Sequence, residues 1–406
     1  MAKVKKTQNY WAIPFVLVLA LLLASGLAYY MFSTSLRMEL AYIFRSPYLV
    51  QNPLVVDEVG PTGPLDPNTN PYYKIVHPSA YAVDAASLVR FSDQEGAEAT
   101  RKELVKYIWN TSELPKRMPD SVKTDIEDSE FHDFQRFFSK KGLWFIGWWE
   151  NLSRWESVSV SSPYVPTSFS EVFYPIRDNG RLLIWVNGHD GDYYLDEPYM
   201  SYFLAQGYTV AAFNMPTLDP KEDMAKVHDK MGLFEHPGYS PIQAFLDPIA
   251  VELNYLLSKK SYRDVTMMGI SGGGWTTTVY AAVDPRIDNS YPVAGGLPFY
   301  LRTLPPNENK PFGDWELTAP TLYSKANLLE MYVLAASSGR RQMQVLNQYD
   351  TCCWAGVNAR SYERPTSEKA ATLGGKYSLY IDPNYHHSIS DTALQAIADD
   401  LDRRRP

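Results

Sequence analysis

The sequence lacks an excess of positive charge. Its 406 residues include 38 Lys and Arg against 46 Asp and Glu, a formal net charge of -8 at pH 7. The basic residues are scattered along the chain and form no stripe. Because nucleic-acid-binding domains need a concentrated basic surface, we expect no nucleic-acid partner.

Cysteine is scarce, and the only two, Cys352 and Cys353, are adjacent. Neighbouring Cα atoms are about 3.8 Å apart, which is shorter than an ordinary disulfide span, so a bond between these two would be strained and easily reduced. Two interpretations stay open. The pair is either two unbridged thiols packed as small hydrophobic side chains, which we favour, or a bridge that braces its loop in an exported protein.

Charge is nearly absent from residues 11–32, a stretch long enough to cross roughly 30 Å of hydrocarbon as a helix. Three lysines precede it and only Arg37 follows closely, so the positive-inside rule predicts a cytoplasmic tail over residues 1–10. We expect a single-pass anchor in the lipid bilayer, with the bulk of the chain extracytoplasmic. A cleaved signal peptide is the alternative, with a small-residue site at 26–28.

Internal repeats and low-complexity tracts are absent as well, and the rest of the chain divides by pattern. Residues 33–83 are rich in Pro, Asn and Tyr, which favours a stalk or wrapped extension. Residues 84–153 predict a small helical accessory region, with a helix before Trp109 capped by Ser92 or Asp93. The aromatic run 143–149 is consistent with buried packing, a membrane-surface belt or a carbohydrate-stacking platform.

From residue 154 to 406 the pattern changes to strands that alternate with helices, which predicts an α/β domain. A chain with 45% hydrophobic residues and this length can bury such a core. The alternation favours a mostly parallel central sheet flanked by helices. Strands are predicted at 156–161, 168–174, 181–186, 208–213, 264–268, 291–293, 342–346 and 377–381.

A glycine-rich run around Ser271 follows the strand predicted at 264–268 and opens a helix predicted at 275–283. Glycines stand two residues before and two after this serine, at Gly269 and Gly273, as a turn too tight for side chains requires. The N–H of Gly272 would point outward at the helix N-terminus, where it favours negative charge. The pattern predicts a nucleophilic serine. A phosphate loop is disfavoured because no Gly-Lys-Ser/Thr follows, and a turn that binds nothing is the remaining alternative.

Over residues 154–406 these features resemble the α/β-hydrolase superfamily, nearest to bacterial carboxylesterases and dienelactone-hydrolase-like members. The resemblance implies a catalytic triad in the chain order Ser, Asp, His. Asp350 follows the strand at 342–346 and would be the acid, with Asp382 as the substitute. His387 begins a His-Ser-Ile-Ser ending similar to that of such esterases and would be the base, in preference to His386.

The resemblance also implies a second oxyanion donor in the loop at 187–191, from the backbone N–H of His189 or Asp190. With Asp192, these two side chains could ligate a metal. However, neighbours on one loop rarely give three convergent ligands, so we expect neither metal nor cofactor. The Pro- and aromatic-rich segment 297–328 occupies the position of a lid.

Together these features predict a membrane-anchored serine esterase that cleaves a small or polymer-borne carboxylic ester through an acyl-enzyme. Three alternatives stay open: a peptidase of the same fold, a catalytically silent binding protein, and a metal-dependent hydrolase. No propeller-like repeat accompanies the domain, which disfavours a prolyl-peptidase arrangement. The sequence names neither the natural substrate nor the oligomeric state.

Overall fold

The computed structural model describes residues 82–124, 151–162, 164–189, 193–218, 225–228, 230–302, 314–348, 350, 354, 356–384 and 386–403. Outside these residues lie the predicted tail 1–10, the apolar segment 11–32, most of the extension, the aromatic run 143–149 and both cysteines. Within the part of the chain that is described, no helix has the length and apolar character needed to cross a membrane.

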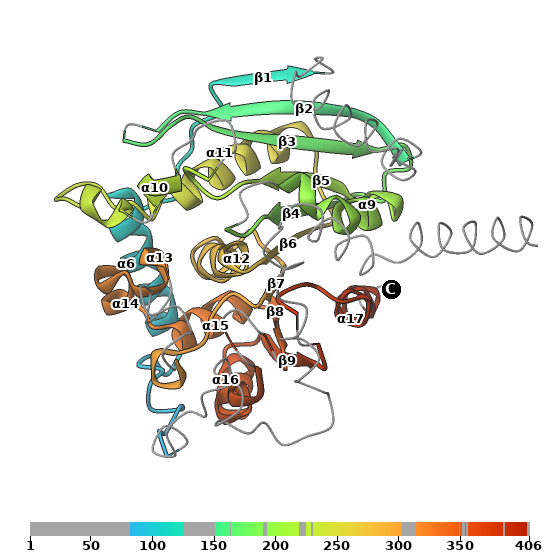
Figure 1. Ribbon diagram of the computed structural model, residues 1–406. Helices are drawn as coiled ribbons and strands as arrows, with labels where there is room; N and C mark the ends of the chain where they lie inside the picture. The colour runs from blue at the N-terminus through green and yellow to red at the C-terminus, as the bar shows by residue number, and fades with distance from the viewer. Residues whose placement is uncertain are drawn as a thin grey trace, which may run out of the picture.

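The described residues form one nine-stranded sheet, in the order β1-β2-β3-β5-β4-β6-β7-β8-β9 (Figure 1). Strands β1, β2, β3 and β5 pair antiparallel, and from β5 through β4 to β9 every pairing is parallel. The predicted α/β class with a mostly parallel sheet is therefore confirmed. The strands are β1 (Ser121–Thr124), β2 (Leu152–Val160), β3 (Ser168–Pro175), β4 (Arg181–Val186), β5 (Thr209–Phe213), β6 (Asp264–Ile270), β7 (Asn289–Val293), β8 (Arg341–Asn347) and β9 (Lys376–Asp382).

The eight strands predicted from the sequence are all present and differ from the prediction only by a few residues at their ends. Strand β1 was not predicted, and the region 84–153, for which only helix was expected, contributes it to the edge of the sheet. Four residues with no buried position give too short an alternation to detect. Pairing with β2 places these residues in the sheet.

Helices cover both faces of the sheet. Successive side chains of a strand point to opposite faces, so the apolar strands present hydrophobic side chains on both faces, and helices bury them. In β4, Leu182 and Ile184 belong to one buried core while Leu183 and Trp185 belong to the other. The first core packs against α6 (Gln94–Trp109), α11 (Gln243–Lys259), α12 (Gly272–Val283), α15 (Leu328–Ala336) and α16 (Arg360–Thr372). The second packs against α9 (Glu197–Ala205) and α17 (Asp391–Asp402), which Figure 1 shows on the opposite side.

Helix α6 lies in the region predicted as helical, and its predicted cap is confirmed. The Asp93 side chain accepts a hydrogen bond from the N–H of Gly96 at 2.8 Å. This bond satisfies one of the N–H groups that a helix start leaves unpaired. The helix buries Leu104 and Ile108 in the same core as α12 and α15.

Short elements connect the larger ones. They are α10 (Ala225–His228), α13 (Trp315–Thr318) and α14 (Pro320–Lys325), together with 3-10 turns at Tyr193–Asp196, Met231–Phe234, Phe299–Leu301 and Gly356–Ala359. Figure 1 shows α10, α13 and α14 on the same side of the sheet as α6.

Candidate active site

Ser271 occupies a sharp turn between β6 and α12. Strand β6 ends at Ile270 and α12 begins at Gly272, which leaves one residue for the change of direction. Its backbone adopts φ 57° and ψ -123°, a conformation that costs a non-glycine residue energy and persists only where its surroundings impose it. Two hydrogen bonds do so: its N–H donates to Val293 O at 2.9 Å, and its carbonyl accepts from Trp275 N at 3.0 Å.

The glycines around Ser271 allow the start of α12 to contact the end of β4. A Cβ on Gly273 would lie 2.0 Å from Val186 O and 2.6 Å from Asn187 O. One on Gly269 would lie 2.6 Å from the backbone of Gly273. Real Cβ atoms do not approach backbone this closely, so only glycine fits at either position.

Asp350 and His387 meet beyond the carboxyl ends of β8 and β9. The Nδ1 atom of His387 lies 2.8 Å from Asp350 Oδ2, and Asp350 is 1% exposed. A carboxylate oxygen accepts, so Nδ1 donates and Nε2 is the nitrogen that can take up a proton. Because β6, β8 and β9 are parallel members of one sheet, the turn at Ser271 opens at this same edge.

Asp382 and His386, the alternatives to this acid and base, make different hydrogen bonds. The carboxylate of Asp382 accepts hydrogen bonds from Ser390 Oγ and from Thr392 Oγ1 at the start of α17. The backbone N–H of His386 donates to Asn384 Oδ1 at 3.1 Å. The geometry thus brings together Asp350 and His387, and assigns Asp382 to the start of α17.

Asn347, the last residue of β8, was not singled out from the sequence. It is fully buried, and its side-chain amide donates to Ser388 O at 3.0 Å and to Asp350 Oδ2 at 3.4 Å. Its Oδ1 atom accepts from Asn384 at 3.3 Å. Asn347 therefore connects the Asp350 segment to the segment that carries His387. Its only signal in the sequence is its place directly after a buried strand.

His189 lies against the start of α12. A Cβ on Gly272 would be 2.6 Å from His189 Cε1 and 2.2 Å from Met215 Sδ, so the loop after β4 packs on the residue that follows Ser271. The other predicted oxyanion donor, Asp190, lies outside the described residues. The imidazole of His189 lies beside two acidic residues of the predicted lid segment, with Nε2 at 3.0 Å from Glu316 Oε1 and 3.1 Å from Asp314 Oδ2.

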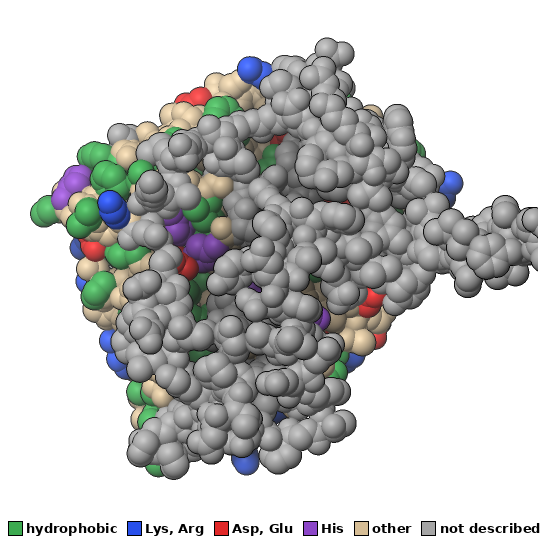
Figure 2. Space-filling view, in the orientation of Figure 1, with side chains coloured by type: hydrophobic (Ala, Val, Ile, Leu, Met, Phe, Trp, Pro, Cys, Tyr) green, Lys and Arg blue, Asp and Glu red, His purple; other side chains and the backbone are tan. Residues whose placement is uncertain are grey.

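A second histidine, His228, completes this group. Its ring contacts that of His189 edge-on, with centroids 5.2 Å apart, and its Nε2 lies 3.7 Å from Glu316 Oε2. Burial lowers the pKa of His228, partly opposed by the nearby Glu316 carboxylate, so the neutral imidazole is favoured. On the face in Figure 2, histidine side chains lie next to an acidic one. The sequence analysis grouped His189 with Asp190 and Asp192 instead, and both of those lie outside the described residues.

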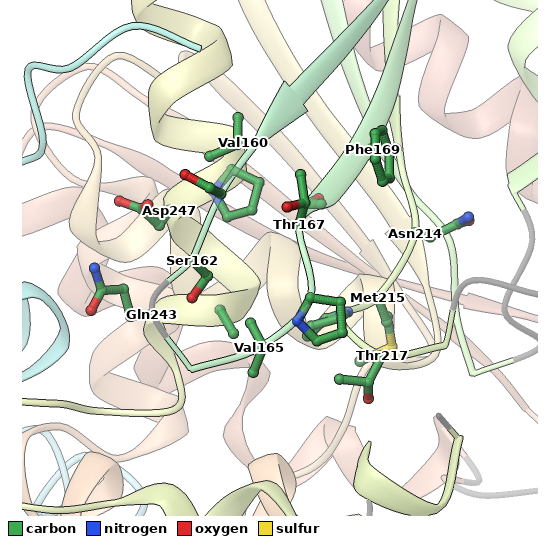
Figure 3. Close-up of a pocket in the computed structure, with 16 residues that line it drawn as sticks. Val160, Ser162, Val165, Thr167, Phe169, Asn214, Met215, Thr217, Gln243 and Asp247 are labelled. Carbon is green, nitrogen blue, oxygen red and sulfur yellow. The ribbon is translucent and has the colours of Figure 1, made fainter. Parts of the chain in front are cut away.

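A surface hollow lies between the β2–β3 connection and the start of α11 (Figure 3). Val160, Ser162 and Thr167 line one side, and Gln243 and Asp247 another. Met215, which also touches the space beside Gly272, lines it too. The hollow and the serine turn therefore share one side chain.

Comparison with known proteins gave matches only among solved structures. No protein-family model and no curated protein matches the chain. Methylesterase BT1017 superposes with a TM-score of 0.57 at 16% identity, covering 79% of this chain and 68% of that one. Acetyl Xylan Esterase 1 from Thermoanaerobacterium sp. gives a TM-score of 0.47 at 14% identity, over 78% and 96% of the two chains. Pyrococcus horikoshii acylaminoacyl peptidase gives 0.44 at 14% identity, over 63% and 43%.

Of these three structures, the methylesterase alone superposes well enough to indicate a common fold. The other two, with TM-scores of 0.47 and 0.44, are too distant to support an argument. At 16% identity it carries the architecture and nothing finer. The chain therefore has an α/β fold with a mostly parallel sheet, shared with a structure of the esterase type.

Proposed function

We propose that this chain is a serine hydrolase that cleaves carboxylic esters through an acyl-enzyme intermediate. The observation that carries the proposal is the 2.8 Å contact between His387 and Asp350 at the sheet edge where the strained turn presents Ser271. A buried acid that holds an imidazole in one tautomer is the arrangement that activates a serine hydroxyl.

In the proposed reaction, His387 Nε2 removes the proton of Ser271 as Oγ attacks the ester carbonyl carbon. The oxyanion accepts hydrogen bonds from the N–H of Gly272 and from the loop at 187–191, through His189 or Asp190. The imidazolium then protonates the leaving alcohol as the C–O bond breaks. A water molecule, deprotonated by the same histidine, releases the acid and restores Ser271.

The test of the nucleophile uses the full-length chain in detergent with p-nitrophenyl acetate and a fluorophosphonate probe. We expect Ser271→Ala to lower kcat by several powers of ten and to abolish labelling, because no other group would form the acyl-enzyme. Ser258→Ala, at the exposed end of α11, is the matched control and should behave as the unaltered chain. Hydrolysis by Ser271→Ala at the original rate would rule the proposal out.

The test of the acid compares Asp350→Asn with Asp382→Asn, since both aspartates lie at the carboxyl ends of neighbouring strands. Loss of the carboxylate beside His387 favours the wrong tautomer, so Asp350→Asn should lower kcat roughly 10³- to 10⁴-fold. Asp382→Asn should leave kcat within about tenfold, because its hydrogen bonds go to Ser390 and Thr392. The reverse ranking would move the triad acid to Asp382.

A peptidase or a silent binding protein would give different results in the same assays. An anilide hydrolysed faster than the matched ester favours the peptidase. Folded protein that neither turns over esters nor labels at Ser271 favours the binding protein.

We also propose that residues 11–32 anchor the chain with the catalytic domain extracytoplasmic. This rests on the apolar run and the lysines before it. Protease added to intact cells should degrade the catalytic domain, and protection from protease until the cells are opened would contradict the orientation.

A further inference from the structure

His189, His228 and Glu316 converge from three segments far apart in the sequence. His189 follows β4, His228 ends α10, and Glu316 lies in α13, which belongs to the predicted lid segment. One ligating atom from each of the three lies within 4.8 Å of the other two. His228 is 2% exposed and Glu316 is fully buried, so this is a built interior group and not a chance surface cluster.

The contacts of His228 determine which of its nitrogens carries a hydrogen. Its Nδ1 lies 2.9 Å from the carbonyl oxygen of Pro216, which can only accept, so Nδ1 donates. The neutral ring then presents the lone pair of Nε2 toward Glu316 Oε2 at 3.7 Å. A backbone carbonyl on the opposite nitrogen is the usual support of a histidine that ligates a metal through Nε2.

These two facing atoms lack the contacts that burial requires. Within the described parts of the chain, His228 Nε2 and Glu316 Oε2 are both buried without a hydrogen-bond partner. A lone pair and a carboxylate oxygen repel each other, and leaving either polar atom unsatisfied is costly. A hydrogen bond between them would need a separation of about 2.7–3.2 Å, which is shorter than the one observed. A cation between the two atoms would satisfy both.

We propose that His189 Nε2, His228 Nε2 and Glu316 Oε2 bind a Zn²⁺ ion, with Asp314 Oδ2 beside them as a fourth ligand. Ligands about 2.0–2.2 Å from a tetrahedral zinc lie roughly 3.3–3.6 Å from one another. Here His228 Nε2 lies 3.7 Å from Glu316 Oε2 and His189 Nε2 lies 3.1 Å from Asp314 Oδ2, while one ligand atom of each of the three residues lies within 4.8 Å of the others, so a bound ion would draw the group slightly together. Two imidazoles and one or two carboxylates suit zinc and disfavour Mg²⁺ and Ca²⁺, which prefer oxygen ligands alone.

A zinc ion at this position would join three separate segments of the chain. It would tie the loop after β4, the end of α10 and the predicted lid segment together directly beside Gly272, whose missing Cβ faces His189. The proposal goes beyond the hydrolase function and does not depend on it, since it concerns metal binding by these side chains alone.

The experiment titrates ZnCl2 into the full-length chain after treatment with a chelator, by calorimetry and by metal analysis after desalting. We expect one zinc per chain and a melting temperature that rises on zinc addition, because the ion binds only the folded state. His228→Ala and Glu316→Gln should weaken zinc binding by roughly tenfold to a hundredfold or more. His236→Ala is the matched control, because this exposed histidine also places Nδ1 at 3.0 Å from a proline carbonyl but lies outside the group.

A second measurement uses the unaltered chain and does not require any variant to fold. Co²⁺ added to the chelator-treated protein should give the intense visible absorption of a tetrahedral site, and Zn²⁺ should displace it. The proposal is overturned if the unaltered chain retains no zinc and gives no such absorption, or if His228→Ala and Glu316→Gln bind zinc as tightly as His236→Ala. Fluorophosphonate labelling of Ser271, read in parallel, reports the hydrolase function separately.

Discussion

At the scale of single residues, Glu252 is a carboxyl buried where its charged form is disfavoured. It lies in α11, fully buried, and its carboxyl accepts a hydrogen bond from the hydroxyl of Ser170 in β3. Burial, with a smaller contribution from the Glu156 carboxylate, raises its pKa from 4.5 to about 8. The side chain is therefore neutral in the folded protein at neutral pH.

This pKa predicts how stability depends on pH. Above pH 4.5 the unfolded chain releases the proton, while the folded chain keeps it until about pH 8, so the stability contributed by Glu252 falls as pH rises through this window. We expect Glu252→Gln to raise the free energy of unfolding at pH 8, by on the order of a few kcal/mol, since one pKa unit corresponds to about 1.36 kcal/mol. At pH 4 the two proteins should be alike.

Denaturant unfolding of both proteins across pH 4 to 9 measures this difference. Glu103→Gln, on the exposed face of α6, controls for the loss of a carboxylate and should show no such pH-dependent gain. A Glu252→Gln protein less stable than the unaltered chain at pH 8 would contradict the prediction.

At the scale of elements, the turn from β6 to α12 depends on contact between a helix start and a strand end. Gly273 is the tightest point, since the space for its Cβ is taken by Val186 O at 2.0 Å. Backbone atoms cannot rotate away as a side chain can, so any added carbon has to move α12 relative to β4.

We therefore expect Gly273→Ala to lower the stability by about 1–3 kcal/mol, the usual cost of an overpacked interior. It should also slow fluorophosphonate labelling of Ser271, because the turn is displaced. Thr278→Ala, which introduces the same residue one turn further along the buried side of α12, is the matched control. Labelling and melting temperature are read on all three proteins. Equal values for Gly273→Ala and the unaltered chain would mean that the helix start tolerates a side chain.

At the scale of the whole molecule, α6 is joined to the central sheet by a buried arginine as well as by its apolar face. Arg101 donates to Ala282 O at 3.0 Å and to Leu334 O at 3.2 Å, near the carboxyl ends of α12 and α15. These carbonyls lie in the last turns of their helices, where backbone oxygens lack α-helical partners and carry partial negative charge, and Leu334 O also accepts from the N–H of Ser337 at 3.3 Å. Residues 94–109 and the sheet should therefore unfold together.

Arg101→Met should lower the temperature of a single calorimetric transition by a few degrees, without producing a separate one. The variant should lose no more than about 2 kcal/mol of the free energy of unfolding, because a second buried guanidinium, that of Arg340, lies close to Arg101. Burial and the charge of Arg101 lower the pKa of Arg340 to about 9, and this repulsion is relieved in the variant. Lys102→Met, exposed on the same helix, is the control. Two separate transitions in Arg101→Met would show that α6 forms an independent unit.

The sequence alone determined what depends on neighbours along the chain. Alternation and β-branched runs predicted eight of the nine strands in the described part of the chain, because side-chain periodicity is local. The glycines around Ser271 predicted a sharp turn for the same reason, since a glycine permits tight backbone conformations at its own position. The order of Ser271, Asp350 and His387 followed from a resemblance, and their roles stay predictions.

Tertiary structure decided which distant groups meet. The fold brings His387 to Asp350 and leaves Asp382 with Ser390, although both aspartates lie at the carboxyl ends of neighbouring strands. It also pairs His189 with Glu316, 127 residues away, where the sequence offered only Asp190 and Asp192 nearby. Hydrogen-bond and ligand geometry depends on distances between separate elements to within a few tenths of an ångström, and local patterns carry no information about such distances.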